Sequence, residues 1–75
     1  MPDREPILKR FGQNVRRKRE AYRISQEGLA EIADLDRTYV GGIERGERNP
    51  TLVSAARIAK ALQVRVADLC AEIDG

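Results

Sequence analysis

Few side chains in this sequence could do covalent chemistry. The chain has no His and a single Cys, Cys70, which stands between Leu69 and Ala71. Catalytic sites usually combine a nucleophile with a base such as His, and zinc sites need a cluster of Cys and His. The sequence has neither combination, and it has no Gly-rich phosphate loop. We therefore expect Cys70 to be a small apolar side chain, and we expect no enzyme activity, metal, cofactor or small-molecule ligand.

What the sequence offers instead is positive charge, which is unevenly distributed. The formal net charge is only +2. Residues 1–24 hold eight Lys and Arg against three acidic residues, whereas residues 25–50 hold three against six. A basic segment of this kind indicates an anionic partner, although the run RRKR at 16–19 is also typical of a solvated helix face.

Composition also bears on compartment and size. A lone Cys predicts a reducing compartment, and the uncharged stretches are too short to cross a membrane. The N-terminal MPDREP lacks the apolar run of a secretory signal. We expect a cytoplasmic protein with one small domain over residues 1–75, a flexible arm at 1–5 and no separate ligand-sensing module.

Residues that start and end helices divide the chain into five segments. Pro6 suits the first turn of a first helix. Ser25, Asp36 and Thr51 suit the N-caps of three further helices, and Gly46 suits the left-handed residue that follows the third. A short fifth helix is expected over about 66–73, and the alternation typical of strands is absent from the sequence. The fold class is therefore all-α, a five-helix bundle.

The inward faces of these helices follow from the helical spacing of apolar residues. The expected core residues are Leu8, Phe11, Val15, Tyr22, Leu29, Ala30, Ala33, Val40, Ile43, Leu52, Ala55, Ile58, Ala59, Leu62, Val66, Leu69 and Ile73. The last helix has more apolar surface than a short terminal helix needs for a core. We therefore expect a dimerisation region over 64–75, with an interface formed by Val64, Val66, Leu69, Cys70 and Ile73.

Residues 25–46, SQEGLAEIADLDRTYVGGIERG, are the segment most informative about function. Their spacing predicts two short helices joined by a tight turn, with the small Ala30 where the helices cross. Asp34 can adopt the left-handed conformation that such a turn needs. This is the helix-turn-helix arrangement, in which the second helix enters the DNA major groove.

At these residues the sequence resembles the phage-repressor and Cro-like (Xre-type) helix-turn-helix regulators, which share the lambda-repressor-like fold. The resemblance runs over roughly residues 12–69 and includes RTYV, IERG, NPTL and RIAKAL. It implies a transcription regulator that binds a near-palindromic operator on double-stranded DNA as a homodimer. Arg23, Asp34 and Gln63 stand where the family often has Gly after a helix.

Within the family, RTYVGGIERGERN is similar to the controller proteins of restriction–modification systems. Phage repressors and antitoxins share much of the motif and remain alternatives. A protein-interaction module that keeps the fold without binding DNA is a further alternative, favoured slightly by the acidic residues of 25–50.

The resemblance also implies which residues contact DNA. Positions that match base-reading ones lie along the second helix of the motif: Arg37, Thr38 and Gly42, with Gly41 adjacent to Gly42 on the same DNA-binding surface. Positions that match contacts to the DNA backbone lie in and around the same motif: Gln26, Tyr39, Arg45, Arg48 and Asn49. Arg19 and Glu44 match an internal ion pair that joins the first helix to the end of the third.

Gly41 and Gly42 are unusual because each Gly inside a helix costs about 1 kcal/mol relative to Ala. They also remove side chains from the surface that is expected to read DNA. One explanation is that the missing side chains let the helix backbone approach the bases closely. The other is that tertiary contacts hold the helix in spite of its weak propensity. The sequence leaves both open.

Overall fold

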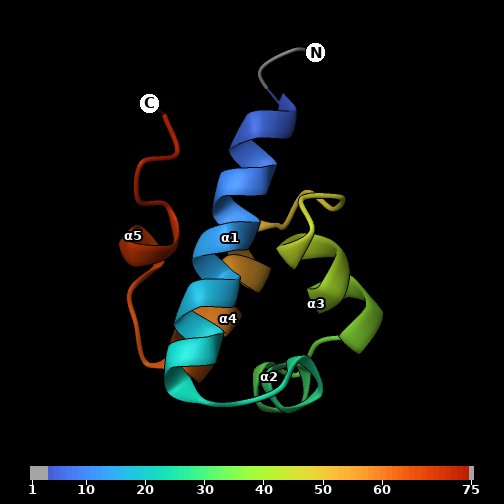
Figure 1. The fold of residues 1–75 in the computed structure, drawn as a ribbon. Coiled ribbons are helices and arrows are strands. Elements are labelled where there is room, and N and C mark those ends of the chain that lie inside the picture. Colours follow the sequence, from blue (N-terminus) through green and yellow to red (C-terminus); the bar gives the residue numbers. More distant parts are fainter. Residues whose placement is uncertain (1–3, 75) are drawn as a thin grey trace.

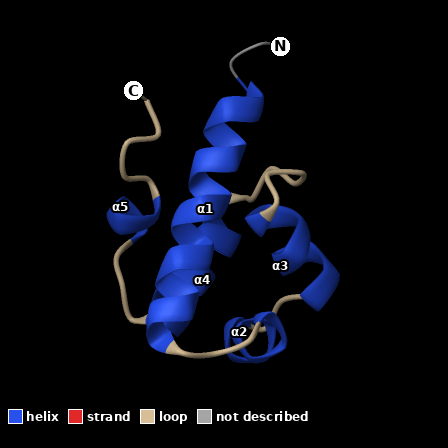
Figure 2. Cartoon of the chain, viewed as in Figure 1, coloured by secondary structure: helices blue, strands red, loops and turns tan. Residues whose placement is uncertain are grey.

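The helical spacing in the sequence corresponds to five helices in the computed structural model, which describes residues 4–74. They are α1 (Arg4–Tyr22), α2 (Gln26–Ala33), α3 (Arg37–Glu44), α4 (Leu52–Leu62) and α5 (Val66–Leu69). Within the described residues no strand occurs, so the all-α prediction is confirmed (Figure 2). Residues 1–3 of the expected arm lie outside the described part of the chain, whereas Arg4 and Glu5 already belong to α1.

Helix α1 runs through the middle of the molecule, and the other elements pack around it (Figure 1). It contacts α3 on one side, α5 on another side and α4 behind it, while α2 packs against α3 and α4. Because α2 packs on α4 and α3 packs on α1, the relative orientation of α2 and α3 is fixed by the whole bundle.

The helix caps agree with those expected from the sequence. The side chains of Ser25, Asp36 and Thr51 each accept a hydrogen bond from a backbone amide in the first turn of α2, α3 and α4, at 2.9, 3.0 and 3.0 Å. Gly46 follows α3 with φ +76. Three residues expected at Gly-like positions, Arg23, Asp34 and Gln63, have left-handed φ values of 66, 58 and 59.

The core lies where α1, α2, α3 and α4 meet, and its fully buried side chains include Val15, Leu29, Val40 and Ile58. Two expected core residues are wrong: Tyr22 is 40% exposed and Leu52 is 76% exposed. Tyr22 is the last residue of α1 and Leu52 the first of α4. The apolar spacing extends to the last residue of a helix, but the other helices do not extend far enough to cover the side chains at its ends.

The fifth helix is shorter than expected, because it ends at Leu69 instead of continuing to about residue 73. The Asn14 side chain donates hydrogen bonds to the carbonyl oxygens of Leu69 and Ala71, each at 2.9 Å. A longer helix would use the Leu69 carbonyl for its own ladder. Val66 and Ile73, expected in the core, are only partly buried against it.

Candidate nucleic-acid interface

Helices α2 and α3 form the two arms of a helix-turn-helix. Ala30 lies buried in the packed core between them, with 3% of its surface exposed. The turn begins at Asp34, whose left-handed backbone directs its amide to the carbonyl oxygens of Ala30 and Glu31. The chain then changes direction and α3 begins at Arg37, at the side of the molecule away from α5 (Figure 1).

The first turn of α3 carries two of the residues expected to read bases, Arg37 and Thr38, and both are exposed. The Asp36 carboxylate already accepts the hydrogen bond from the Tyr39 amide at 3.0 Å, so the Thr38 hydroxyl is not needed as a cap. An arginine fork and a hydroxyl group at the start of an exposed helix can hydrogen bond to base edges.

The C-terminal end of α3 is anchored by an ion pair between Arg19 and Glu44. The guanidinium Nε and Nη2 atoms of Arg19 donate to the two Glu44 carboxylate oxygens at 2.7 and 3.1 Å. The two side chains are 12% and 2% exposed. Hydrogen bonding to Glu44 raises the pKa of the Arg19 guanidinium above its usual value. Arg19 also donates to the carbonyl oxygen of Ile24 at 2.9 Å, which ties the start of the α2 segment to the same pair.

Gln26, the first residue of α2, belongs to the same network. Its side-chain amide donates to a Glu44 carboxylate oxygen at 3.0 Å, and its amide oxygen lies beside Gly41. Gln26, which is expected to contact a phosphate, is therefore held between the N-terminus of α2 and α3, the helix expected to read bases, which we call the recognition helix. Backbone N–H groups and the helix dipole at the α2 N-terminus favour an anion.

Tyr39 belongs to α3, and its side chain extends to the beginning of α4. Its hydroxyl group donates to Ser54 Oγ at 3.1 Å and accepts from the Thr51 amide at 3.4 Å. The Arg48 guanidinium lies over the ring, 5.7 Å from its centroid. The ring therefore supports Arg48 on one side and is fixed by the α4 N-terminus at its hydroxyl end.

Gly41 and Gly42 follow Arg37 and Thr38 by one helical turn, yet both are buried. Arg45 and Arg48 cover them: a Cβ placed on Gly41 would lie 3.1 Å from Arg45 Nη1, and one placed on Gly42 would lie 2.6 Å from Arg48 Cγ. Arg45 also pairs with Glu47 at 3.0 Å, and Asn49 is exposed in the loop after α3. The side chains of Arg45 and Arg48, which follow α3 in the sequence, therefore cover the face of α3 that includes the two glycines.

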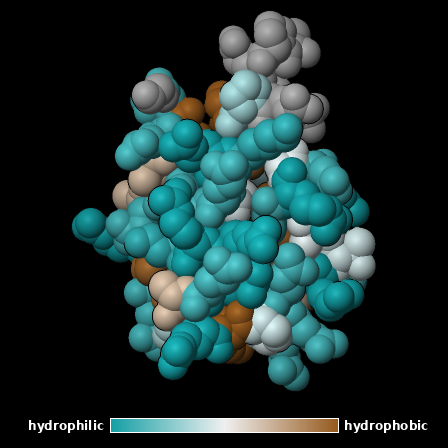
Figure 3. All heavy atoms as spheres, in the orientation of Figure 1, coloured by the Kyte–Doolittle hydropathy of each residue, from teal (hydrophilic) through white to brown (hydrophobic). Residues whose placement is uncertain are grey.

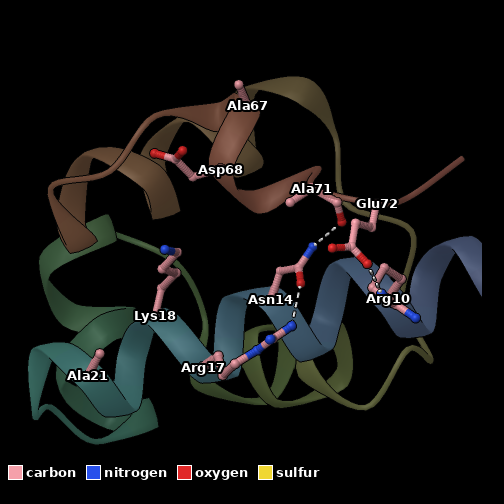
Figure 4. Close-up of a pocket in the computed structure, with 9 residues that line it drawn as sticks. All are labelled: Arg10, Asn14, Arg17, Lys18, Ala21, Ala67, Asp68, Ala71 and Glu72. Atoms are coloured by element: carbon pink, nitrogen blue, oxygen red, sulfur yellow. Dashed lines mark hydrogen bonds and ion pairs between the residues drawn. The ribbon is translucent and has the colours of Figure 1, made fainter. Parts of the chain in front are cut away.

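A groove on the opposite side of α1 has a different character (Figure 4). Its lining mixes basic side chains of α1 with acidic side chains of the C-terminal segment, and Arg10 pairs with Glu72 at 3.3 Å. Asn14 bridges the groove, because it donates to the C-terminal carbonyl groups and accepts from Arg17 at 2.9 Å. Four of the polar lining residues, Arg10, Asn14, Arg17 and Glu72, thus bond within the groove itself.

The surface around α1 and α3 is mostly hydrophilic, with only small apolar areas (Figure 3). Among residues 4–74 no group of three or more His, Cys, Asp or Glu is placed to hold a metal ion. None of the described helices is long and apolar enough to span a membrane.

Several of the expected contact residues touch one another in the structure: Arg45 and Gln26 lie beside Gly41, and Arg48 lies against Gly42 and over the Tyr39 ring. Leu69, expected at a dimer interface, is fully buried in the core, so that expectation is corrected: it cannot contact a second copy. Sequence reasoning missed Gly12, Asn14 and Ser54. Gly12 offered a signal, because a Gly inside a long helix beside the core residue Phe11 indicates a close backbone contact.

Comparison with known proteins agrees with this geometry. Residues 15–69 match the helix-turn-helix family. The chain is 45% identical over 73 residues to the control protein C.SmaI of Serratia marcescens, covering 92% of this chain and 87% of that protein. It superposes on the restriction–modification controller protein C.AhdI from Aeromonas hydrophila with a TM-score of 0.81 and 48% identity, over 83% of this chain and 94% of that one.

A third similar protein, C.Esp1396I, has been solved bound to a 19 base pair DNA duplex. Its TM-score is 0.80 and its identity 34%, over 89% of each chain. The matched family, the identity to C.SmaI and the common fold agree with one another, and this chain belongs to the helix-turn-helix family, among the control proteins of restriction–modification systems.

Proposed function

We propose that the protein regulates transcription in a restriction–modification system by binding a near-palindromic operator on double-stranded DNA as a homodimer. The observation that carries this proposal is the exposed start of α3. Arg37 and Thr38 project from a helix whose other end is anchored by Arg19 and Glu44. The similar controller C.Esp1396I has been solved bound to a DNA duplex, which supports DNA binding by this chain.

In this proposal α3 enters the major groove and Arg37 reads a base edge. The two N–H groups of an arginine fork match guanine O6 and N7, which makes guanine the expected base. Thr38 lies against the same groove, where Arg45 and Arg48 cover the buried Gly41 and Gly42. Gln26 and the N-terminus of α2 bind one phosphate. Tyr39, Arg45, Arg48 and Asn49 contact the backbone next to the groove and supply affinity that depends on salt.

Dimerisation would place two copies of α3 about 34–36 Å apart, one helical turn of DNA, so that each reads half of the operator. Partly buried apolar side chains at the end of the chain, Val64, Val66, Cys70 and Ile73, are the proposed interface. Leu52 and Val53, at the start of α4, are 76% and 63% exposed and add apolar surface to that helix. The fourth and fifth helices therefore remain the proposed dimer surface.

The alternative of a protein-interaction module rested on the acidic residues of 25–50. The fold itself uses several of them: Glu44 pairs with Arg19, Asp36 caps α3 and Glu47 pairs with Arg45. This acidic surplus therefore gives little support to a protein partner. The relatives support a controller protein in preference to a phage repressor or an antitoxin. The family consists of DNA-binding regulators, not enzymes, and we propose that this one acts in the cytoplasm, beside its operator.

Selection of bound sites from a pool of random duplexes tests the proposal. We expect the selected sites to share two related half-sites, and binding to weaken steeply as salt rises. A pool that remains random after repeated selection, with binding that does not change with salt, would contradict it.

A further inference from the structure

Gly42 has almost no exposed surface, although it lies on the same side of α3 as Thr38. What covers it is the aliphatic stem of Arg48. A Cβ placed on Gly42 would lie 2.6 Å from Arg48 Cγ, a distance that real Cβ atoms do not reach. The stem of Arg48 thus occupies the space that any other residue at position 42 would fill.

The far end of Arg48 is held as well. Its guanidinium lies 5.7 Å from the centre of the Tyr39 ring, and the Tyr39 hydroxyl is fixed by Ser54 and Thr51 at the start of α4. Arg48 is otherwise an exposed residue of a loop. Contacts at both the stem and the guanidinium reduce the rotamer freedom that a long side chain loses when it binds a ligand.

We propose that Gly42 is a positioning residue that acts through Arg48. The space left by its missing side chain receives the stem of Arg48, and the Tyr39 ring lies under the guanidinium. We call this site, formed by Gly42 and Tyr39, the Arg48 seat; it holds the guanidinium against α3 before DNA binds. This inference rests on the proposed function, because it concerns how that surface binds DNA. In the earlier explanation, the missing side chain lets the DNA bases approach the α3 backbone. Here the space beside Gly42 is filled instead by Arg48 Cγ, an atom of the protein itself.

Gly41 differs from Gly42 in a way that supplies a control. A Cβ on Gly41 would meet only the guanidinium end of Arg45, at 3.1 Å, and the Gln26 amide oxygen, at 3.4 Å. The end of a flexible side chain can move aside at little cost. Gly41→Ala should therefore leave Arg48 in the Arg48 seat, whereas Gly42→Ala should displace the Arg48 side chain from it.

The first measurement uses the free protein, so it does not depend on DNA binding. In NMR spectra, the Arg48 side-chain resonances should carry ring-current shifts from Tyr39. These shifts should disappear in Gly42→Ala and in Tyr39→Leu, and should persist in Gly41→Ala. Arg48 resonances that are the same in Gly42→Ala as in the unmodified protein would overturn the proposal.

A thermal measurement keeps the test available even where Gly42→Ala is poorly folded. The Cβ of Arg48 lies 3.6 Å from a Cβ placed on Gly42, an ordinary contact, so Arg48→Ala removes the clash. In the Arg48→Ala background, Gly42→Ala should raise the melting temperature because Ala favours the helix. With Arg48 present the gain should be smaller or reversed. Equal gains in both backgrounds would contradict the seat.

The second measurement is a double-mutant cycle on DNA, using a duplex selected by the unmodified protein from a random pool. Arg48→Ala and Gly42→Ala should each weaken binding about tenfold, the loss typical of one charge-assisted hydrogen bond. The double variant should be no weaker than Arg48→Ala alone. If Gly42→Ala weakens the Arg48→Ala protein by a further tenfold, Gly42 acts on DNA directly and the inference is wrong. Failure of the unmodified protein to select any duplex would refute the proposed function, while the NMR and thermal tests of the seat would still hold.

Discussion

Gly12 of α1 lies directly against the backbone of Glu44 at the end of α3. A Cβ on Gly12 would lie 2.6 Å from the Glu44 carbonyl oxygen, and the Ile43 carbonyl oxygen is also in contact. Unlike the arginines beside α3, these are backbone atoms that cannot rotate away. Gly12 therefore sets how closely the recognition helix approaches the central helix of the bundle.

Gly12→Ala should destabilise the protein although Ala is the better helix former. Overpacking costs about 1–3 kcal/mol, and the contact at Gly12 is tight enough to place its cost towards the upper end of that range. This cost exceeds the gain of about 1 kcal/mol that Ala brings as a better helix former. Denaturant unfolding measures the change. Gly41→Ala is the matched control, because its new methyl group meets a flexible side chain, and it should be neutral or stabilising. Equal stability of the two variants would mean that α1 and α3 can move apart freely.

Glu44→Ala tests the buried ion pair. Removing one partner of a buried pair leaves the other charge desolvated, which costs roughly 3–5 kcal/mol. Here Arg19 would lose both of its carboxylate contacts, and Gln26 would lose its acceptor. We expect a large fall in the free energy of unfolding.

The chain offers an exposed pair as the control. Arg16 and Glu20, one turn apart on α1, are 65% and 55% exposed and their N–O distance is 3.2 Å. Exposed pairs contribute about 0–1 kcal/mol, so Glu20→Ala should change stability little. A loss of similar size in Glu20→Ala and Glu44→Ala would show that burial does not set the strength of the Arg19 pair.

Asn14→Leu should loosen the C-terminal segment. The substitution keeps a side chain of similar size but leaves the Leu69 and Ala71 carbonyl groups without their donor. A buried acceptor left without a donor costs about 1–3 kcal/mol, which applies to the buried Leu69 bond more fully than to the part-buried Ala71 bond. Amide hydrogen exchange should speed up over residues 66–74 more than over α2 and α3. Uniformly faster exchange along the chain would instead indicate that Asn14 supports the whole bundle.

The elements that could be predicted from sequence are those whose causes are local. Ser25, Asp36 and Thr51 cap the helices that follow them within three residues, so their roles were visible in the sequence. Arg19 and Glu44 lie far apart in the chain, and their pairing followed only from the family resemblance. Asn14 and Gly42 act through residues of other segments, and no local pattern reveals such partners. Gly12, inside a long helix, signals a close contact, but no local pattern identifies Glu44 as its partner. The expected core positions of Tyr22 and Leu52 were wrong because helical periodicity does not indicate where the core ends.

Self-association can be tested without knowledge of the operator. If Val64, Val66, Cys70 and Ile73 meet a second copy, the melting temperature should rise with protein concentration, since association stabilises the folded form by mass action. Sedimentation should show a dimer at tens of micromolar. A monomer at that concentration, combined with no cooperativity on DNA, would contradict the proposed dimer.

The last prediction separates base reading from backbone contact by comparing Arg37 with Arg48. Arg37 extends from the capped end of α3, whereas Arg48 lies in the following loop over Tyr39. Arg37→Ala should weaken binding to the selected operator by about 1–3 kcal/mol and relax the preference at one base pair in each half-site.

Arg48→Ala should instead weaken binding to all duplexes alike and reduce the salt slope by about one per subunit, because a phosphate contact releases a counterion whatever the sequence. Titrations of both variants against the operator and a scrambled duplex, at several salt concentrations, distinguish the two roles. A loss of sequence preference in Arg48→Ala with an unchanged salt slope would reassign Arg48 to base reading. In that event the seat on Gly42 would position a specificity residue, and substitutions at position 42 would be expected to change which operator is chosen.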